Sequence, residues 1–284
     1  AANSHDIDII IGGHSHTEVN PDAANPLPCK VVNLDGDTVL IAQTGKSGRY
    51  LGEVVLDLDS RKATSRLIPV DKRLDDRIDP QLAAVIEPYR AGVDSLMAVP
   101  IGKSARELPA DSHALLNWLS DFVLAAGEEV AGSHIDVAIM NKGGIRRGLP
   151  KGRITKGIVM TMLPFENKVH VIDIKGVDLA AALDVMASRG GDGVSDGVDV
   201  TFDPATGKCT RIIIDGKTLD PERTYRLATI DYLANGGDYM SPLLRGKTVA
   251  VSKSRLDNAM IDYLQSAAMR GRKVNPSGEQ RMHP

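Results

Sequence analysis

The stretch from Asn141 to Arg146 has residue types that could bind a phosphorylated ligand. It reads Asn-Lys-Gly-Gly-Ile-Arg and directly follows the apolar run from Ile135 to Met140. An apolar run rich in β-branched residues that ends in two glycines is typical of a buried strand leading into a loop. Gly143 and Gly144 would let the backbone approach a ligand closely, and the planar guanidinium of Arg146 suits phosphate. An ordinary turn with a solvated arginine would give the same pattern, so this stretch alone leaves both interpretations open.

Two histidines near the beginning of the chain could bind metal. His14 and His16 follow Gly12-Gly13, and these glycines follow the apolar run from Ile9 to Ile11, which we expect to be a buried strand. Two imidazoles at the C-terminal end of a strand can converge on a metal cluster. Two partly exposed histidines in a turn are the alternative, because a His-x-His spacing alone is a weak signal.

Composition and charge narrow the class of protein. Hydrophobic residues make up 42% and charged residues 25% of 284 residues, which is an ordinary soluble mixture and is long enough for two domains. The net charge of −3 gives no electrostatic indication of a DNA, RNA or acidic membrane partner. No run approaches the length of a transmembrane segment. Cys29 and Cys209 are neither a disulfide framework nor a metal ribbon, and they could pair or stay free.

The first part of the chain predicts short strands, and a helix follows them. Residues 31–33 and 39–43 flank the turn Asp35-Gly36-Asp37, which predicts a hairpin, and residues 51–58 alternate as an antiparallel edge strand does. Asp79 is a good N-cap and Pro80 a good first helical residue. Apolar residues at helical spacing then continue to Leu96, with Pro88 expected to kink the helix. The charged residues before this helix mark a domain boundary.

Beyond the boundary, helices and strands alternate. We therefore expect an α/β fold, of the α+β type with a mixed sheet. The expected helices are residues 114–126, 155–162, 178–189 and 255–269, and the expected strands are residues 135–140, 169–174, 198–202, 210–214 and 225–230. Gly190 should end the third helix. The glycine-rich tract from Gly190 to Gly197 is expected to be mobile, and it lacks the glycine spacing of a dinucleotide-binding loop.

Four separated motifs together resemble the 5′-nucleotidase family, which includes bacterial UDP-sugar hydrolases and 2′,3′-cyclic nucleotide phosphodiesterases. The motifs are Gly12–Thr17, Asn141–Arg146, Leu163–Phe165 and Leu233–Asp238. The resemblance covers nearly the whole chain, and the order and spacing of the motifs make it specific. It implies that residues 1–72 are the end of a metallophosphatase domain, residues 73–96 a linker with a bridging helix, and residues 97–284 the C-terminal substrate-binding domain.

The resemblance also implies which residues bind metal and substrate. His14 and His16 would each bind one of two divalent metal ions, zinc, manganese or similar. Seven residues would bind a nucleoside or nucleotide of the adenosine or AMP type: Asn141, Gly144, Arg146, Phe165, Asn167, Tyr232 and Asp238.

Each implied substrate contact has a physical reason. Phe165 and Tyr232 would stack on the two faces of the base, which is worth about 1–3 kcal/mol per base. Asp238 would accept hydrogen bonds from the ribose hydroxyls, Arg146 would neutralise phosphate, and Asn167 would contact the base edge. Phe165 and Tyr232 could instead be core residues.

The chain also departs from the family pattern. The metallophosphatase domain of the family has an Asp-x-His strand end and an Asn-His-Asp/Glu turn. The only literal Asp-x-His here is Asp111-Ser112-His113, which does not follow an apolar strand, and Asn-His occurs nowhere. Because each ion needs about three or four protein ligands, we expect an incomplete catalytic centre and no activity of this chain alone. The chain begins at Ala1, and we expect a processed or truncated product whose remaining metallophosphatase part lies in cis or in a separate chain.

These observations favour one function and leave two others open. The expected function is part of a metal-dependent nucleotide phosphohydrolase of the 5′-nucleotidase type, in which this chain supplies nucleotide binding and two metal-ligand histidines. The alternatives are a nucleoside- or nucleotide-binding module without catalysis and a 2′,3′-cyclic nucleotide phosphodiesterase. By resemblance, the protein would work in the periplasm or at the cell surface.

Overall fold

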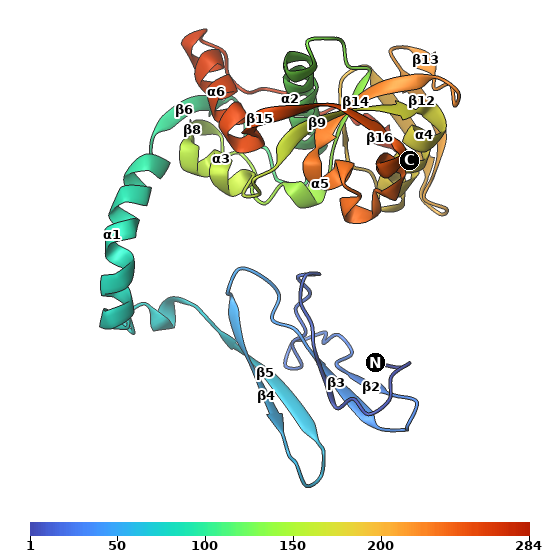
Figure 1. The fold of residues 1–284 in the computed structure, drawn as a ribbon. Coiled ribbons are helices and arrows are strands. Elements are labelled where there is room, and N and C mark those ends of the chain that lie inside the picture. Colours follow the sequence, from blue (N-terminus) through green and yellow to red (C-terminus); the bar gives the residue numbers. More distant parts are fainter. The chain divides into compact units, whose positions relative to one another are not determined.

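The computed structural model describes residues 1–284, except for the side chain of Ala91. The chain divides into two compact units, which we name unit 1 (Ala1–Pro88) and unit 2 (Tyr89–Pro284). Unit 1 is blue to teal in Figure 1, and unit 2 continues from teal to red.

Unit 1 is built from short strands. β1, β3 and β2 form a three-stranded sheet in that order, with β1 parallel and β2 antiparallel to β3. β4 and β5 form a separate antiparallel hairpin, as the alternating residues of β4 predict. The strands are β1 (Ile9–Ile11), β2 (Lys30–Val32), β3 (Thr38–Ala42), β4 (Tyr50–Leu56) and β5 (Ala63–Pro69), and the 3-10 helix η1 spans Lys72–Leu74. The expected hairpin around Gly36 is confirmed, with Gly36 at φ 82°.

Little of unit 1 is buried. Among the described residues, its buried hydrophobic side chains are Val19, Val39, Leu40 and Ala42. The prediction that β1 is buried was wrong, because Ile11 is 78% exposed. β1 has only three residues and lies at the edge of its sheet, where it pairs with β3 alone.

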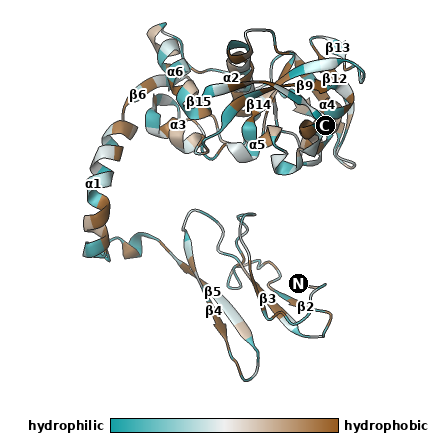
Figure 2. Cartoon of the chain, viewed as in Figure 1, coloured by the Kyte–Doolittle hydropathy of each residue, from teal (hydrophilic) through white to brown (hydrophobic). Residues whose placement is uncertain are grey.

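Helix α1 (Pro80–Met97) joins the two units, and it confirms the predicted start. The Asp79 carboxylate accepts hydrogen bonds from the backbone N–H groups of Gln81 and Leu82, at 2.8 and 3.1 Å. The helix continues through Pro88. Hydrophobic and hydrophilic residues alternate along α1 (Figure 2), and the predicted apolar positions, such as Val85 and Ile86, are exposed.

The main sheet of unit 2 has five strands in the order β10-β7-β14-β9-β15. β14 is parallel to β7 and antiparallel to β9, and β15 is antiparallel to β9. The strands are β7 (Val137–Met140), β9 (Lys168–Lys175), β10 (Gly193–Val194), β14 (Thr224–Ile230) and β15 (Lys247–Arg255). This mixed sheet with helices confirms the expected fold class.

Helices and two smaller sheets complete unit 2. The helices are α2 (His113–Ala131), α3 (Lys156–Met162), α4 (Gly176–Ser188), α5 (Asp231–Ala234) and α6 (Leu256–Met269), with 3-10 helices η2 (Lys142–Gly144), η3 (Gly237–Tyr239) and η4 (Ser241–Arg245). The smaller sheets are β13-β12-β11-β16 and β6-β8. Their strands are β6 (Pro100–Ser104), β8 (Gly152–Thr155), β11 (Val198–Asp203), β12 (Lys208–Ile214), β13 (Lys217–Thr218) and β16 (Met282–His283).

Local chemistry explains how two of these helices begin. Ser112 caps α2 by accepting a hydrogen bond from the Leu115 N–H, and Thr155 caps α3, as predicted, by accepting one from the Ile158 N–H. Residues 114–120 of helix α2 are all buried, including Leu115, Leu116 and Leu119, so this part of the helix is enclosed on every side. The four residues of β7 are also buried, so the strand that precedes Asn141 lies inside the core.

The glycine-rich tract after α4 differs from its prediction. We expected residues 190–197 to be mobile, but residues 191–195 are buried and β10 pairs with β7. Gly190 and Gly191 have φ of 81° and 87°, which lets the chain turn sharply out of α4 and back to the sheet edge. The glycines therefore make a tight connection beside β7.

Candidate functional site

Asn141 lies where the buried strand β7 ends, and its side chain is turned toward another loop. Its Nδ2 donates a hydrogen bond to Asp238 Oδ2 at 2.5 Å, although the two residues are 97 positions apart. Its Oδ1 is buried and has no hydrogen-bond partner among the described residues. A buried acceptor without a partner costs about 1–3 kcal/mol, so this oxygen marks the turn as more than a connection.

The loop that carries Asp238 has an unusual backbone. Asp238 and Tyr239 both have left-handed conformations, with φ of 52° and 63°. A non-glycine residue held in such a conformation costs of order 1–3 kcal/mol, and such strain gathers at functional sites. The loop follows β14 and α5, so Asp238 lies near the end of the strand that is parallel to β7.

Tyr232 adds a second hydrogen bond to the same carboxylate. Its hydroxyl donates to Asp238 Oδ1 at 2.9 Å. This hydrogen bond to Asp238 raises the pKa of the Tyr232 hydroxyl above its usual value, because the neutral phenol is the form that can donate. Asn141 and Tyr232 thus hold one oxygen each of the Asp238 carboxylate.

Two glycines make close packing possible around these side chains. A Cβ on Gly237 would lie 2.5 Å from Cε2 of the Tyr232 ring. A Cβ on Gly144 would lie 2.7 Å from Met140 Cε and 2.8 Å from Asn141 Oδ1. Gly144, which we expected at the substrate, therefore also allows the Asn141 amide to take its position.

Phe165 and Arg146 form a second pair. The Arg146 guanidinium carbon lies 5.1 Å from the centroid of the Phe165 ring, in cation–π geometry. The side chains are held by different elements, since Phe165 follows α3 and Arg146 follows η2. The Arg146 N–H donates to the Met162 carbonyl at 2.9 Å, which ties the Asn141–Arg146 turn to the end of α3.

The two aromatic side chains are accessible. Phe165 is 40% and Tyr232 is 45% exposed, so neither is sealed in the core. Asn167 is partly buried, and its carbonyl accepts a hydrogen bond from the Leu256 N–H at 2.7 Å. Glu166, which lies between Phe165 and Asn167 in sequence, pairs with Arg255 at 2.7 Å. A cation–π contact connects the Asn141–Arg146 turn to Phe165, and hydrogen bonds connect the same turn to Asp238 and, through it, to Tyr232.

The histidines belong to unit 1 and are much less constrained. His14 and His16 are both exposed and both left-handed, with φ of 62° and 58°. Between them, the Ser15 hydroxyl accepts a hydrogen bond from Gln43 Nε2 at 2.8 Å. Among the described residues, no group of three or more His, Cys, Asp or Glu side chains is placed to hold a metal ion. The residues present therefore do not fit a complete metal site.

The sequence did not lead us to Arg189 and Asp192, which contact the Asp238 loop and the Asn141–Arg146 turn. Arg189 Nη1 donates to the Asp238 carbonyl at 2.7 Å, and Asp192 Oδ1 accepts from the Lys142 N–H at 2.9 Å. We passed over them because they lie in and beside the glycine-rich tract that we expected to be mobile. The available signal was an arginine and an aspartate on either side of a glycine turn that ends a helix.

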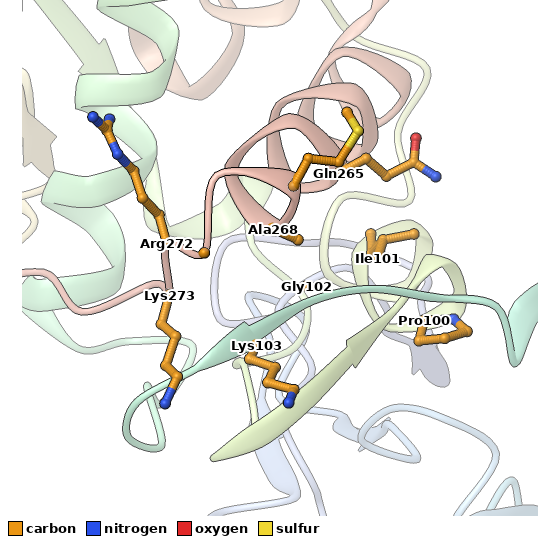
Figure 3. Close-up of a pocket in the computed structure, with 10 residues that line it drawn as sticks. Pro100, Ile101, Gly102, Lys103, Gln265, Ala268, Arg272 and Lys273 are labelled. Carbon is orange, nitrogen blue, oxygen red and sulfur yellow. The ribbon is translucent and has the colours of Figure 1, made fainter.

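A separate groove of about 690 Å³ lies along β6 and the end of α6. It is lined by apolar residues such as Ile101 and by Lys103, Arg272 and Lys273. In Figure 3, Lys103 and Lys273 extend in the same direction and Arg272 extends away from them. The groove shares no residue with the site around Asp238, and its lining has neither an aromatic ring nor a carboxylate. We therefore do not place the nucleoside there.

The fold and the site place the chain in a known family. Residues 94–245 match the family of 5′-nucleotidase C-terminal domains, and the chain belongs to this family, as the four motifs predicted.

Relatives of known identity agree with this assignment. The trifunctional nucleotide phosphoesterase protein YfkN of Bacillus subtilis is 28% identical over 97% of this chain and 20% of its own length. An apyrase of Tabanus yao is 30% identical over 82% of this chain and 49% of its own. The crystal structure of a 5′-nucleotidase precursor from Thermus thermophilus matches with a TM-score of 0.75 and 28% identity, over 97% of this chain and 59% of that one. The chain thus spans between a fifth and three fifths of the length of these relatives.

Proposed function

We propose that this chain is the nucleotide-binding part of a metal-dependent phosphohydrolase of the 5′-nucleotidase type. The family of the chain supports this proposal, and so do relatives whose names describe phosphoesterase, apyrase and nucleotidase activities. The ligand that we propose is a nucleoside or nucleotide of the adenosine or AMP type.

The observation that carries the proposal is the arrangement around the Asp238 carboxylate. A carboxylate has about four lone-pair sites, two on each oxygen. Asn141 uses one site on Oδ2 and Tyr232 uses one on Oδ1. One site therefore remains on each oxygen, and this pair matches the two adjacent hydroxyl groups of a ribose.

The aromatic pair supplies the base contact in this proposal. Phe165 and Tyr232 are both exposed side chains, and a base stacks on such rings with about 1–3 kcal/mol per base. The Arg146 guanidinium lies over the Phe165 ring, and a base would stack on the opposite face. Asn167 would contact the base edge.

The phosphate contact would come from Arg146. Its guanidinium stacks on an exposed ring and has no carboxylate partner among the described residues, so it is available to an anion. Asn141 and Gly144 would contact the ligand from the same turn.

We further propose the domain assignment and the role of the histidines. Residues 1–72 would belong to a metallophosphatase domain, residues 73–96 to a linker and bridging helix, and residues 97–284 to the substrate-binding domain. His14 and His16 would contribute one ligand each to two divalent ions, such as zinc or manganese, whose other ligands lie outside these 284 residues. We propose the periplasm or the cell surface as the place of action. None of the described helices has the length and apolar character needed to cross a bilayer.

Calorimetry of the 284-residue chain with adenosine and AMP tests the proposal. Phe165→Ala and Tyr232→Ala should each weaken binding by about 5- to 150-fold, because each removes one stacking surface of about 1–3 kcal/mol. Tyr89→Ala, at an exposed aromatic on α1, is the matched control and should leave affinity unchanged. Unchanged affinity in both Phe165→Ala and Tyr232→Ala would remove the stacking model.

A binding module without catalysis is the second candidate, and the sparse metal ligands in the described residues favour it for this chain by itself. We expect the chain to bind AMP without releasing phosphate, in buffer with either zinc or manganese. The measurement is phosphate release with AMP and with 2′,3′-cyclic AMP. Release that depends on His14 would show instead that the 284 residues are sufficient for hydrolysis.

A further inference from the structure

Arg189 joins the two loops that carry the candidate nucleoside site. It directly follows α4, and its Nη1 donates to the Asp238 carbonyl at 2.7 Å while its Nη2 donates to Asp192 Oδ2. The other oxygen of Asp192 accepts from the Lys142 N–H at 2.9 Å. A continuous path of hydrogen bonds therefore runs from the Asp238 loop through Arg189 and Asp192 to the Asn141–Arg146 turn.

Burial makes this path difficult to rearrange. Asp192 is only 4% exposed, and a buried carboxylate needs a partner of opposite charge and hydrogen-bond donors. Arg189 supplies the charge, and Arg189 and the Lys142 N–H supply donors. If either contact were lost, the Asp192 carboxylate would remain buried with incomplete compensation.

The segment around Asp192 is itself fixed beside the site. Gly193 and Val194 pair with Met140 and Ile139, so Asp192 lies immediately next to the end of β7. Lys142 Nζ also donates to the Gly190 carbonyl at 3.4 Å. The Arg189–Asp192 pair is thus held beside β7, the strand that leads into Asn141.

Arg189 also contacts Asp238, whose carboxylate we propose as the acceptor for the ribose hydroxyls. It holds the carbonyl of Asp238, whose backbone is left-handed, and its Nη1 lies 3.8 Å from Asp238 Oδ2. Asn141 and Tyr232 donate hydrogen bonds to the two carboxylate oxygens. The guanidinium therefore holds the backbone of Asp238 by a hydrogen bond and also places a positive charge close to the carboxylate.

We propose that Arg189 and Asp192 are positioning residues that set recognition of the ribose hydroxyls by Asp238. This inference rests on the proposed function. Neither residue needs to touch the ligand, because Arg189 acts through the backbone and carboxylate of Asp238 and Asp192 acts through Arg189 and Lys142.

The test compares adenosine with 2′,3′-dideoxyadenosine, which lacks both hydroxyl groups, by calorimetry of the 284-residue chain. Arg189→Met should weaken adenosine binding about tenfold. This is the loss expected when one hydrogen bond from a ribose hydroxyl to the charged Asp238 carboxylate is no longer made. The affinity for 2′,3′-dideoxyadenosine should change by less than about twofold, since Asp238 makes no ribose contact with it. The ratio of the two affinities should therefore fall about tenfold.

Two further variants and one control sharpen the test. Arg189→Lys keeps the charge but cannot donate to Asp238 and Asp192 with two fixed groups, so it should restore little of the ratio. Asp192→Asn should lower the ratio in the same direction. Arg226→Met is the matched control, because Arg226 is 33% exposed against 28% for Arg189, and it pairs with Asp173 near the beginning of β14.

The outcomes separate this inference from the proposed function. If the unaltered chain does not bind adenosine, the proposed function fails. If the unaltered chain prefers adenosine and Arg189→Met keeps that preference, or weakens both ligands equally, the positioning role alone is refuted. The urea midpoint of Trp118 fluorescence identifies any variant that has lost its fold, and in that case Arg189→Lys and Asp192→Asn decide the question by the same ratio.

Discussion

Asp238 in unit 2 and His14 in unit 1 are both loop residues with left-handed backbones, but their surroundings differ. Asn141 and Tyr232 donate to the Asp238 carboxylate, and Arg189 holds the Asp238 carbonyl. His14 is exposed and has no hydrogen-bond partner among the described side chains. The proposed nucleoside contacts are therefore held in place within unit 2, whereas no side chain of the described residues fixes the direction of the His14 ring.

The strands that lead to these two residues also differ in burial, with the more buried strands in unit 2. β7 and β14 lie inside a five-stranded sheet with buried residues, but β1 is a three-residue strand at the edge of its sheet. Small sheets without a covering layer are at best marginally stable. Buried packing in this chain is thus concentrated around the proposed substrate contacts.

The largest effect is expected from a cavity in the core of unit 2. Ile139→Ala, in the fully buried strand β7, should lower the free energy of unfolding by about 2–5 kcal/mol. Urea unfolding followed by the fluorescence of the single tryptophan, Trp118 in α2, measures this effect. Leu40→Ala removes the same kind of side chain from unit 1 and should leave the Trp118 transition in place. An equal shift of that transition by both variants would show that the units unfold together.

The second prediction tests which of the two units contributes to adenosine affinity. Asp238→Asn should weaken adenosine binding by about 10- to 150-fold, because a hydrogen bond to a charged group contributes about 1.5–3 kcal/mol. His14→Ala and His16→Ala should leave the affinity of the 284-residue chain within about twofold, since the exposed histidines make none of the proposed nucleoside contacts. Calorimetry measures both. A loss on His14→Ala as large as that on Asp238→Asn would contradict the proposed division of roles.

A smaller difference between the two units is expected in their rates of cleavage by trypsin. The exposed segment around η1 contains Lys72, Arg73 and Arg77 and buries no residue, so trypsin should cut there on the order of tenfold faster than in unit 2. Mass spectrometry identifies the first fragments. The fragment from Ile78 onward should keep Trp118 fluorescence and adenosine binding. A first cut inside unit 2 would contradict the expected order of cleavage.

The smallest effect is a pH dependence that differs in sign between the units. In unit 2, the hydrogen bond to the Pro284 carbonyl and that to Asp199 raise the pKa of His283 above 6.5. Its folded pKa exceeds its unfolded pKa, so its contribution is full below about pH 6.5 and is lost as pH rises through the folded value. In unit 1, the hydrogen bond to His5 lowers the pKa of Asp35, so that contribution is lost as pH falls.

Urea midpoints of the wild-type chain and of His283→Gln measure the contribution of His283 to the free energy of unfolding of unit 2. The difference between them should be less than about 1 kcal/mol, as for partly exposed ion pairs, and should shrink from pH 5.5 to pH 8.5. An NMR titration of the Asp35 carboxyl carbon measures the direction in unit 1. A difference that grows with pH for His283→Gln would reverse the assigned sign.

Much of the fold of unit 2 could be read from local sequence. Gly190 ends α4 and Thr155 caps α3 as predicted, because turns and caps depend on a few neighbouring residues. The strand that precedes Asn141 was predicted because its apolar run is continuous. β15 and β6 were missed, since their residues alternate weakly and become strands only by pairing with β9 and β8.

The candidate site was predictable only in part. Asn141, Phe165, Tyr232 and Asp238 followed from motifs, and the structure connects them through hydrogen bonds and the Asn141–Arg146 turn. Their roles remain proposals. Arg189 and Asp192 could not be predicted, because their importance comes from contacts with residues about 50 positions away. The burial of β1 was predicted wrongly because a sequence does not show whether a second layer covers a strand.

The contact between Gly237 and the Tyr232 ring has a consequence for redesign. Any side chain at position 237 would collide with the ring, so the orientation of the ring and the identity of that glycine are not independent choices. A library that varies Tyr232 to accept other bases should therefore keep Gly237, whereas one that varies position 237 alone would sample mostly displaced rings. Inheritance of the two positions as a pair would be the corresponding signature in natural variants.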